Sequence, residues 1–96
     1  MAVYFVGRLK TEDWSWLREY GAATKALIEK HGGRYLAQGG KMEAVEGTQP
    51  LPSALVLIEF PDTESAHAWH EDPEYQPLMA LRQANSELEM TLVEGV

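Results

Sequence analysis

Two short segments of the chain carry apolar residues on both of their alternating faces. Residues 3–9 are apolar at Phe5 and also at the neighbouring Tyr4 and Val6. Residues 54–60 read Ala-Leu-Val-Leu-Ile-Glu-Phe and are bounded by prolines. Apolar residues at successive positions are typical of a strand that is covered on both sides. Both segments are therefore predicted to be inner strands of a sheet.

A long amphipathic segment follows the first of these strands. Thr11 or Asp13 supplies an N-cap side chain, and apolar residues then recur at helical spacing until Gly32-Gly33 ends the helix. Residues 34–38 are predicted to form the second strand. After a bend at the next glycine pair, residues 42–46 are expected to resume its pairing.

The second half of the chain repeats this order of elements. Asp62 is expected to cap a short helix, and Asp72, with Pro73 at the first helical position, to start another that runs to about Ala84. Residues 88–94 alternate apolar and polar side chains, which is typical of a strand with one exposed face.

The order strand, helix, strand, strand, helix, strand predicts an α+β fold of the ferredoxin-like βαββαβ type in a single domain, residues 1–96. Right-handed crossovers place both helical regions on one face of the four-stranded antiparallel sheet. The other face then exposes the second apolar side of the inner strands unless another molecule covers it. We therefore expect a homodimer that pairs through the open sheet face.

Composition excludes several classes of partner. The formal net charge is −7, and the eight Lys and Arg residues are scattered, which disfavours nucleic acid and anionic membrane surfaces. Cysteine is absent, so that no disulfide or thiolate site can form. The apolar N-terminus meets Gly7 and Arg8 too soon for a signal segment or a membrane span. We expect a cytoplasmic protein.

Several short motifs, taken in order and spacing, are similar to those of one family. They are Gly32-Gly33-Arg34-Tyr35-Leu36-Ala37, Gly39-Gly40, Glu46-Gly47, Ile58-Glu59-Phe60-Pro61, Ala68-Trp69, Pro73-Glu74-Tyr75, Leu81-Arg82 and Val93-Glu94-Gly95. With them the chain resembles the bacterial family known as domain of unknown function 1330. The resemblance implies a dimeric α/β-barrel fold. It also implies kinship with cofactor-free monooxygenases, haem-degrading enzymes and lactone isomerases, although this branch has no established activity. The chain departs from the family at His70, where members often have Tyr.

Glu59 is the candidate catalytic residue, because it is a carboxylate in a strand that is otherwise apolar. Burial would raise the pKa of such a group unless a cation or a donor holds it charged. It is either a general base or ligand-orienting carboxylate, or an acid that reaches water or forms a structural ion pair. Strand parity alone leaves open which face of the sheet Glu59 occupies.

Arg82 shares an otherwise apolar helical stripe with Tyr75 and Leu78. A planar guanidinium there is able to bind a ligand carboxylate through two hydrogen bonds. The alternative is a structural ion pair with Glu59, Glu46 or the carboxylates near the C-terminus.

The proposed ligand site combines these residues with aromatic ones. The residues expected to line a space between sheet and helices are Tyr35, Glu59, Trp69 and Arg82. Packing, the default role of aromatic side chains, explains most of the aromatic residues without a ligand. The resulting hypothesis is a homodimeric domain that binds a small apolar or carboxylate-bearing ligand. One alternative is a cofactor-free monooxygenase or isomerase in which Glu59 or a histidine moves a proton. The other is a structural dimer that recruits a further protein.

No metal or cofactor is expected. His67 and His70 lie three residues apart on a helix, a spacing that metal ligands also use, but no third ligand is evident from the sequence. Two solvated side chains are the more common explanation of such a pair. The glycine pairs lack the patterns of phosphate-binding loops, and no serine stands in the context of a catalytic nucleophile.

Overall fold

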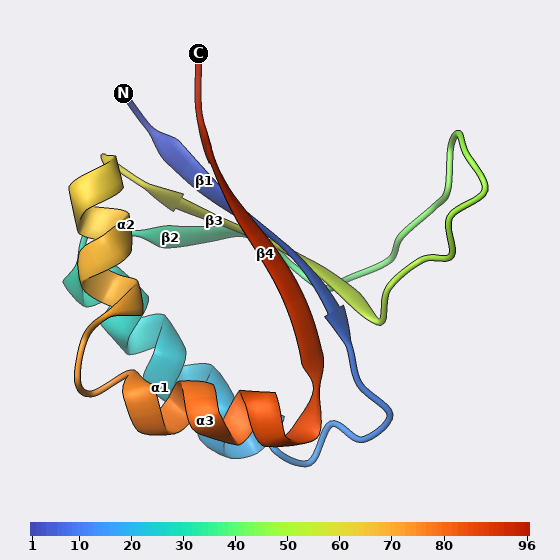
Figure 1. The fold of residues 1–96 in the computed structure, drawn as a ribbon, viewed down its shortest axis with the longest axis horizontal. Coiled ribbons are helices and arrows are strands. Elements are labelled where there is room, and N and C mark those ends of the chain that lie inside the picture. Colours follow the sequence, from blue (N-terminus) through green and yellow to red (C-terminus); the bar gives the residue numbers. More distant parts are fainter.

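The computed structural model describes all 96 residues. Its elements, in chain order, are β1 (Val3–Lys10), α1 (Leu17–Lys30), β2 (Arg34–Gln38), β3 (Ala54–Phe60), α2 (Thr63–His70), α3 (Gln76–Asn85) and β4 (Glu87–Glu94). The strands form one antiparallel sheet in the order β2-β3-β1-β4, and the helices lie together on one of its faces (Figure 1). The predicted α+β fold of ferredoxin-like type is confirmed, with the second helical region divided into α2 and α3.

The two segments with apolar residues on both faces are the inner strands, as predicted. Their side chains divide between the faces of the sheet: Phe5 and Ile58, paired across β1 and β3, are buried beneath the helices. Val6 and Leu57, also paired, are half-buried on the open face. The chain itself leaves this second apolar surface without a covering layer.

The predicted start of the first helix is wrong. Helix α1 begins at Leu17, and Trp16 at its N-cap makes no capping hydrogen bond. The Thr11 hydroxyl donates instead to the carbonyl of Asn85 at 2.9 Å, which ties this turn to the end of α3. The Asp13 carboxylate accepts from the backbone N–H of Ser15 at 2.9 Å, still ahead of the helix. Both capping candidates are therefore used in the turn between β1 and α1.

The predicted role of Asp72 as an N-cap is also wrong, because α3 begins at Gln76 and has no side-chain cap. The Asp72 carboxylate accepts from the backbone N–H of Glu74 at 2.8 Å and also binds side chains of α1. By contrast, Asp62 caps α2 as predicted and accepts from the backbone N–H of Ser65 at 2.7 Å.

The third correction concerns residues 42–46, which do not pair with the sheet. Gly39 and Gly40 have φ values of +75° and +84°, a backbone region that favours glycine and that turns the chain away from β3. The segment that follows extends away from the sheet before β3 begins (Figure 1). None of the helices is both long enough and apolar enough to cross a membrane.

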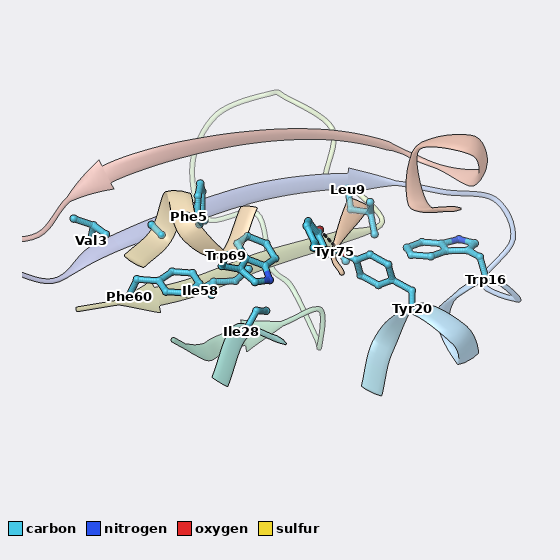
Figure 2. Close-up of a cluster of buried hydrophobic side chains, with 12 residues drawn as sticks. Val3, Phe5, Leu9, Trp16, Tyr20, Ile28, Ile58, Phe60, Trp69 and Tyr75 are labelled. Atoms are coloured by element: carbon cyan, nitrogen blue, oxygen red, sulfur yellow. Dashed lines mark hydrogen bonds between the residues drawn. The ribbon is translucent and has the colours of Figure 1, made fainter. Parts of the chain in front are cut away.

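A cluster of aromatic side chains fills the space between the sheet and α2 (Figure 2). The ring of Trp69, which is 1% exposed, lies 5.6 Å from those of Phe5 and Phe60 and 4.5 Å from that of Tyr75, between centroids. Ile28 of α1 is fully buried in the same core. Burying side chains of this size supplies the dominant favourable term in folding.

Candidate functional site

A cavity of about 350 Å³ lies between the sheet and the adjoining parts of α1 and α3. This volume falls within the range of about 300–1,000 Å³ that is usual for small-molecule sites. Most of its 16 lining residues are hydrophobic. They are Leu9, Trp14, Trp16, Leu17, Tyr20, Tyr35, Gln38, Gly39, Gly40, Ser53, Ala54, Val56, Ile58, Arg82, Leu88 and Met90.

Arg82 is the only charged residue that lines this cavity. It is 6% exposed, and no acidic side chain forms an ion pair with it. Its buried Nε finds no hydrogen-bond acceptor in the protein. Because a buried charge is costly unless it is paired, this guanidinium is poised to accept an anionic partner.

Two tyrosines, the half-buried Tyr35 and the buried Tyr75, lie in the electrostatic field of Arg82. Burial raises the pKa of Tyr35, a cavity-lining residue, and the nearby charge of Arg82 opposes that rise only in part. The pKa of Tyr75 is likewise raised by burial, and its hydroxyl lies 2.6 Å from that of Tyr20. Both phenols therefore remain neutral at pH 7, and neither supplies the negative charge that Arg82 lacks.

A β-bulge in strand β2 brings Tyr35 and Gln38 to the same side of the sheet. They are three residues apart, so that a regular strand would point them to opposite faces. Tyr35 pairs with Ile58 and Gln38 with Val56, and the register shifts by one residue between Tyr35 and Ala37. This shift places both side chains in the cavity lining.

Aromatic rings form the wall of the cavity on the side of α1. The ring of Trp14, which is 43% exposed, stacks on that of Trp16 with centroids 6.1 Å apart. Trp16 in turn meets Tyr20 edge to face at 5.3 Å. The series continues to Tyr75, which belongs to the packed core around Trp69.

The structure separates the four predicted ligand-binding residues. Tyr35 and Arg82 both line the cavity. Glu59 lies on the open face of the sheet, where it accepts a hydrogen bond from Nε of Arg34 at 2.8 Å, and is absent from the lining. Trp69 is fully buried in the aromatic core and does not reach the cavity. The predicted pairing of Arg82 with Glu59 does not occur, since the sheet lies between them.

Trp14, Trp16 and Tyr20 also line the cavity, although they were not among the four predicted ligand-binding residues. Their number and spacing were visible, yet only the late start of α1 puts Trp14 in the preceding turn, at the cavity. Gln38 was missed because the bulge in β2 carries no signal in the residues themselves.

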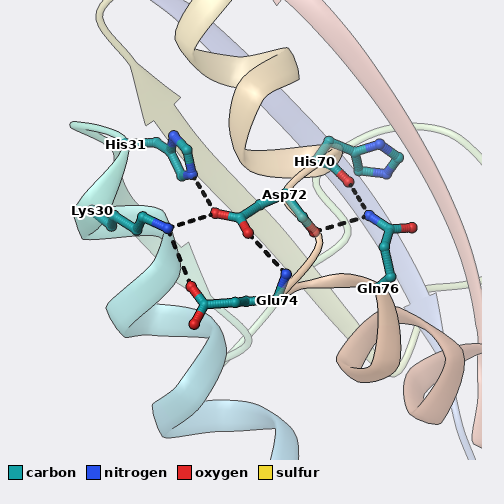
Figure 3. A network of polar contacts seen from close by, with 6 residues as sticks. All are labelled: Lys30, His31, His70, Asp72, Glu74 and Gln76. Atoms are coloured by element: carbon teal, nitrogen blue, oxygen red, sulfur yellow. Dashed lines mark hydrogen bonds and ion pairs between the residues drawn. The ribbon is translucent and has the colours of Figure 1, made fainter.

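The histidines take separate positions. His31, at the C-terminus of α1, bonds the Asp72 carboxylate through Nε2 at 2.7 Å (Figure 3). His70 lies against the aromatic core, its ring 5.9 Å from that of Trp69, and its pKa is lowered by burial and then by Arg82. No group of three or more His, Asp and Glu side chains is arranged to hold a metal ion.

Asp72 lies at the centre of a polar network that includes residues from the end of α1 and from the linker between α2 and α3 (Figure 3). Besides His31, its carboxylate accepts from Nζ of Lys30 at 3.1 Å, and Lys30 also binds Glu74. The hydrogen bond from His31, followed by those from the Glu74 backbone and Lys30, lowers the pKa of Asp72 below its ordinary value. The network ties the end of α1 to the linker between α2 and α3.

A second, larger hollow of about 820 Å³ lies beside the turn after β1. Only two of its 11 lining residues are hydrophobic. Several of its polar groups already bond to one another, as Thr11 does to Asn85 and to Ser53. Its charged residues, among them Lys10, Glu12 and Glu87, are exposed to solvent. It lacks the apolar lining and the buried unpaired charge of the smaller cavity, so the smaller cavity is the better candidate site.

Solved structures with this fold include proteins of known and unknown function. A protein of unknown function from Rhodopseudomonas palustris has a TM-score of 0.80 at 16% identity, covering 99% of this chain and 82% of its own. SnoaB, a cofactor-independent oxygenase from Streptomyces nogalater, has a TM-score of 0.68 at 16% identity, with 99% and 93% covered. A dimeric ferredoxin-like protein of unknown function from Jannaschia sp. CCS1 has a TM-score of 0.74 at 15% identity, with 99% and 100% covered. At such identities the likeness shows the fold alone.

Residues 2–96 match the sequence family described as "Domain of unknown function (DUF1330)". The match covers nearly the whole chain and confirms the resemblance seen in its motifs. No curated protein of known function matches the sequence significantly.

Proposed function

The chain belongs to the DUF1330 family, and we propose that it binds a small apolar ligand with an anionic group in the cavity between sheet and helices. One observation carries the proposal. Arg82 is a buried guanidinium without an acidic partner, and it is the single charge in an otherwise largely apolar lining.

A ligand carboxylate would supply the missing partner. Hydrogen bonds between guanidinium and carboxylate are charge-assisted and form in pairs, and they strengthen where water is excluded. The apolar lining would cover the remainder of such a ligand. The bond between Glu59 and Arg34 supports this assignment indirectly, because the acid that sequence reasoning offered to Arg82 is held on the other side of the sheet.

The test compares two probes of nearly equal shape, 2-naphthoate and 2-naphthalenemethanol, by isothermal titration calorimetry. We expect the anion to bind at least about tenfold more tightly than the neutral alcohol, because only the anion pairs with Arg82. Arg82→Met should abolish this preference. Arg18→Met, at an exposed arginine of α1, is the matched control and should retain it. Equal affinities of both probes for the unaltered protein would contradict the proposal.

We also propose that two copies of the chain pair through the open sheet face. Val6 and Leu57 lie half-buried there although no element of the chain covers them, and one protein of the same fold is described as dimeric. Covering this apolar surface would contribute about 25 cal/mol for each Å² removed from water.

Sedimentation velocity at about 50 µM protein tests the pairing. We expect the unaltered chain to sediment as a dimer and Leu57→Arg as a monomer, because that substitution places a charge within the proposed interface. Val45→Arg, at a residue 88% exposed in the segment before β3, is the control and should remain dimeric. A monomeric unaltered chain would exclude the pairing.

A further inference from the structure

We infer that the ligand is a planar aromatic acid, which enters the cavity with its carboxylate first and lies with its ring against the tryptophan side of α1. The inference rests on the proposed function and specifies its ligand. It depends on three properties of the cavity: the nature of its two walls, the position of its charge, and the exposure of its outer residues.

The first wall of the cavity consists of aromatic rings, from the exposed Trp14 to the buried Trp16 and Tyr20. Trp14 and Trp16 are inclined by 21° to each other, so that their ring faces are nearly parallel. Tyr20 continues this wall and meets Trp16 at 69°. Trp14 lines the cavity and is 43% exposed. A planar ring that slides along this wall would cover Trp14 and stack upon it in an offset arrangement.

The second wall is aliphatic and partly built from the smallest residues. Ala54 and Val56 of β3 face the cavity, and Gly39 adds no side chain where the chain leaves β2. A Cβ built on Gly39 would lie 3.7 Å from that of Ala54, in ordinary contact. The space between an aromatic wall and a wall of small side chains is suited to a flat molecule more than to a bulky one.

The charge of the cavity belongs to a buried residue, whereas part of the lining is exposed. Arg82, Ile58 and Tyr20 are buried, and Trp14, Gln38 and Gly40 are exposed. A ligand carboxylate that enters past the exposed residues must therefore move inward to reach the guanidinium. The end of the ring opposite to the carboxylate then points toward solvent, where further substituents are tolerated.

The experiment compares 2-naphthoate with its fully saturated analogue, decahydro-2-naphthoate, by calorimetry. We expect the aromatic acid to bind about fivefold more tightly, because only flat rings stack on the wall. Trp14→Ala should remove most of this preference while changing the affinity for the saturated acid less than twofold. This tryptophan is exposed at the rim, so its removal leaves the core intact. Leu17→Ala, an aliphatic change at the same rim, should weaken both acids alike.

A third probe tests the orientation. We expect 6-methoxy-2-naphthoate, extended at the end away from the carboxylate, to bind within about threefold of 2-naphthoate, because the added group points to solvent. A loss of more than tenfold would overturn the carboxylate-first orientation. Equal binding of the aromatic and saturated acids would overturn the inference but leave the proposed function standing if Arg82→Met still weakened both. Failure of every acid to bind would overturn both.

Discussion

The space between helices and sheet has a filled end and a hollow end, and both are built from aromatic residues. At the filled end, under α2, the ring of Trp69 packs against those of Phe60 and Tyr75 and is 1% exposed. At the hollow end, beside the start of α1, Trp14 and Trp16 border a cavity of about 350 Å³.

The difference between the two ends is due to the residues that lie around the aromatic rings. Trp69 meets the large rings of inner strands, so that side chains from sheet and helix interlock and exclude space. Around the cavity, by contrast, β3 provides Ala54, the chain after β2 provides Gly39 and Gly40, which carry no side chains, and α3 provides Arg82. Aromatic content by itself therefore does not identify a site. The size of the opposing residues and an unpaired charge do.

Removing a large side chain from the filled end should have the largest effect on stability. Trp69→Ala removes a fully buried ring from a close-packed cluster and is expected to lower the free energy of unfolding by about 3–5 kcal/mol. Urea unfolding followed by circular dichroism, at a fixed protein concentration, measures this loss. Trp14→Ala is the matched change at the hollow end and should cost less than about 1 kcal/mol, since that ring is already exposed. Similar losses of unfolding free energy for the two variants would contradict the difference between the filled and the hollow end.

The polar network at the filled end predicts a pH dependence. The pKa of Asp72 is lowered in the folded state, so its charge stabilises the fold above the ordinary carboxyl pKa, and this contribution is lost as pH falls from there toward the lowered pKa of the folded state. Asp72→Asn should therefore be less stable than the unaltered chain at pH 7, by less than Trp69→Ala. The gap should narrow as pH falls from 5 to 2, and urea titrations across this range measure it. A gap independent of pH would argue against a charged Asp72 as its source.

Filling the hollow end should abolish binding while leaving the fold intact. Ala54→Leu adds three carbons to a buried residue that faces the cavity and is expected to weaken 2-naphthoate binding at least about tenfold. Its free energy of unfolding should remain within about 1 kcal/mol, because the added carbons enter space that is already present. Calorimetry and urea unfolding of the same preparation give both values. Undiminished binding would show that the probe occupies another place.

The smallest expected effect concerns the two arginines that the sheet separates. Arg82→Met removes an unpaired buried charge while keeping an apolar chain, and we expect the free energy of unfolding to rise by about 1 kcal/mol. Arg34→Met breaks an ion pair whose arginine side chain is 68% exposed, and it should change stability by less than about 0.5 kcal/mol. Urea unfolding of both variants compares them. A clear loss for Arg82→Met would indicate a structural partner for its guanidinium.

Much of the architecture follows from local patterns in the sequence. Apolar residues on both faces of residues 3–9 and 54–60 identified the inner strands, because such residues need cover over both faces, which the middle of a sheet provides best. Asp62 capped its helix as expected, since Ser65 lies within reach along the chain. Asp72 did not, because side chains of α1, some 40 residues away in sequence, compete for its carboxylate.

The sequence by itself determined which residue types are available to the candidate site, but not how they are arranged. The chemistry of Arg82 and Tyr35 was evident from their residue types and positions on apolar stretches. The tertiary structure decided the rest. It determines which face of the sheet Glu59 occupies, and its bulge turns Tyr35 and Gln38 to one side. It also leaves Arg82 without an acidic side chain beside it. The reason is physical: hydrophobic periodicity and capping act over a few residues, whereas a cavity is the volume that distant elements fail to fill, and a charge is unpaired only with respect to everything that folds around it.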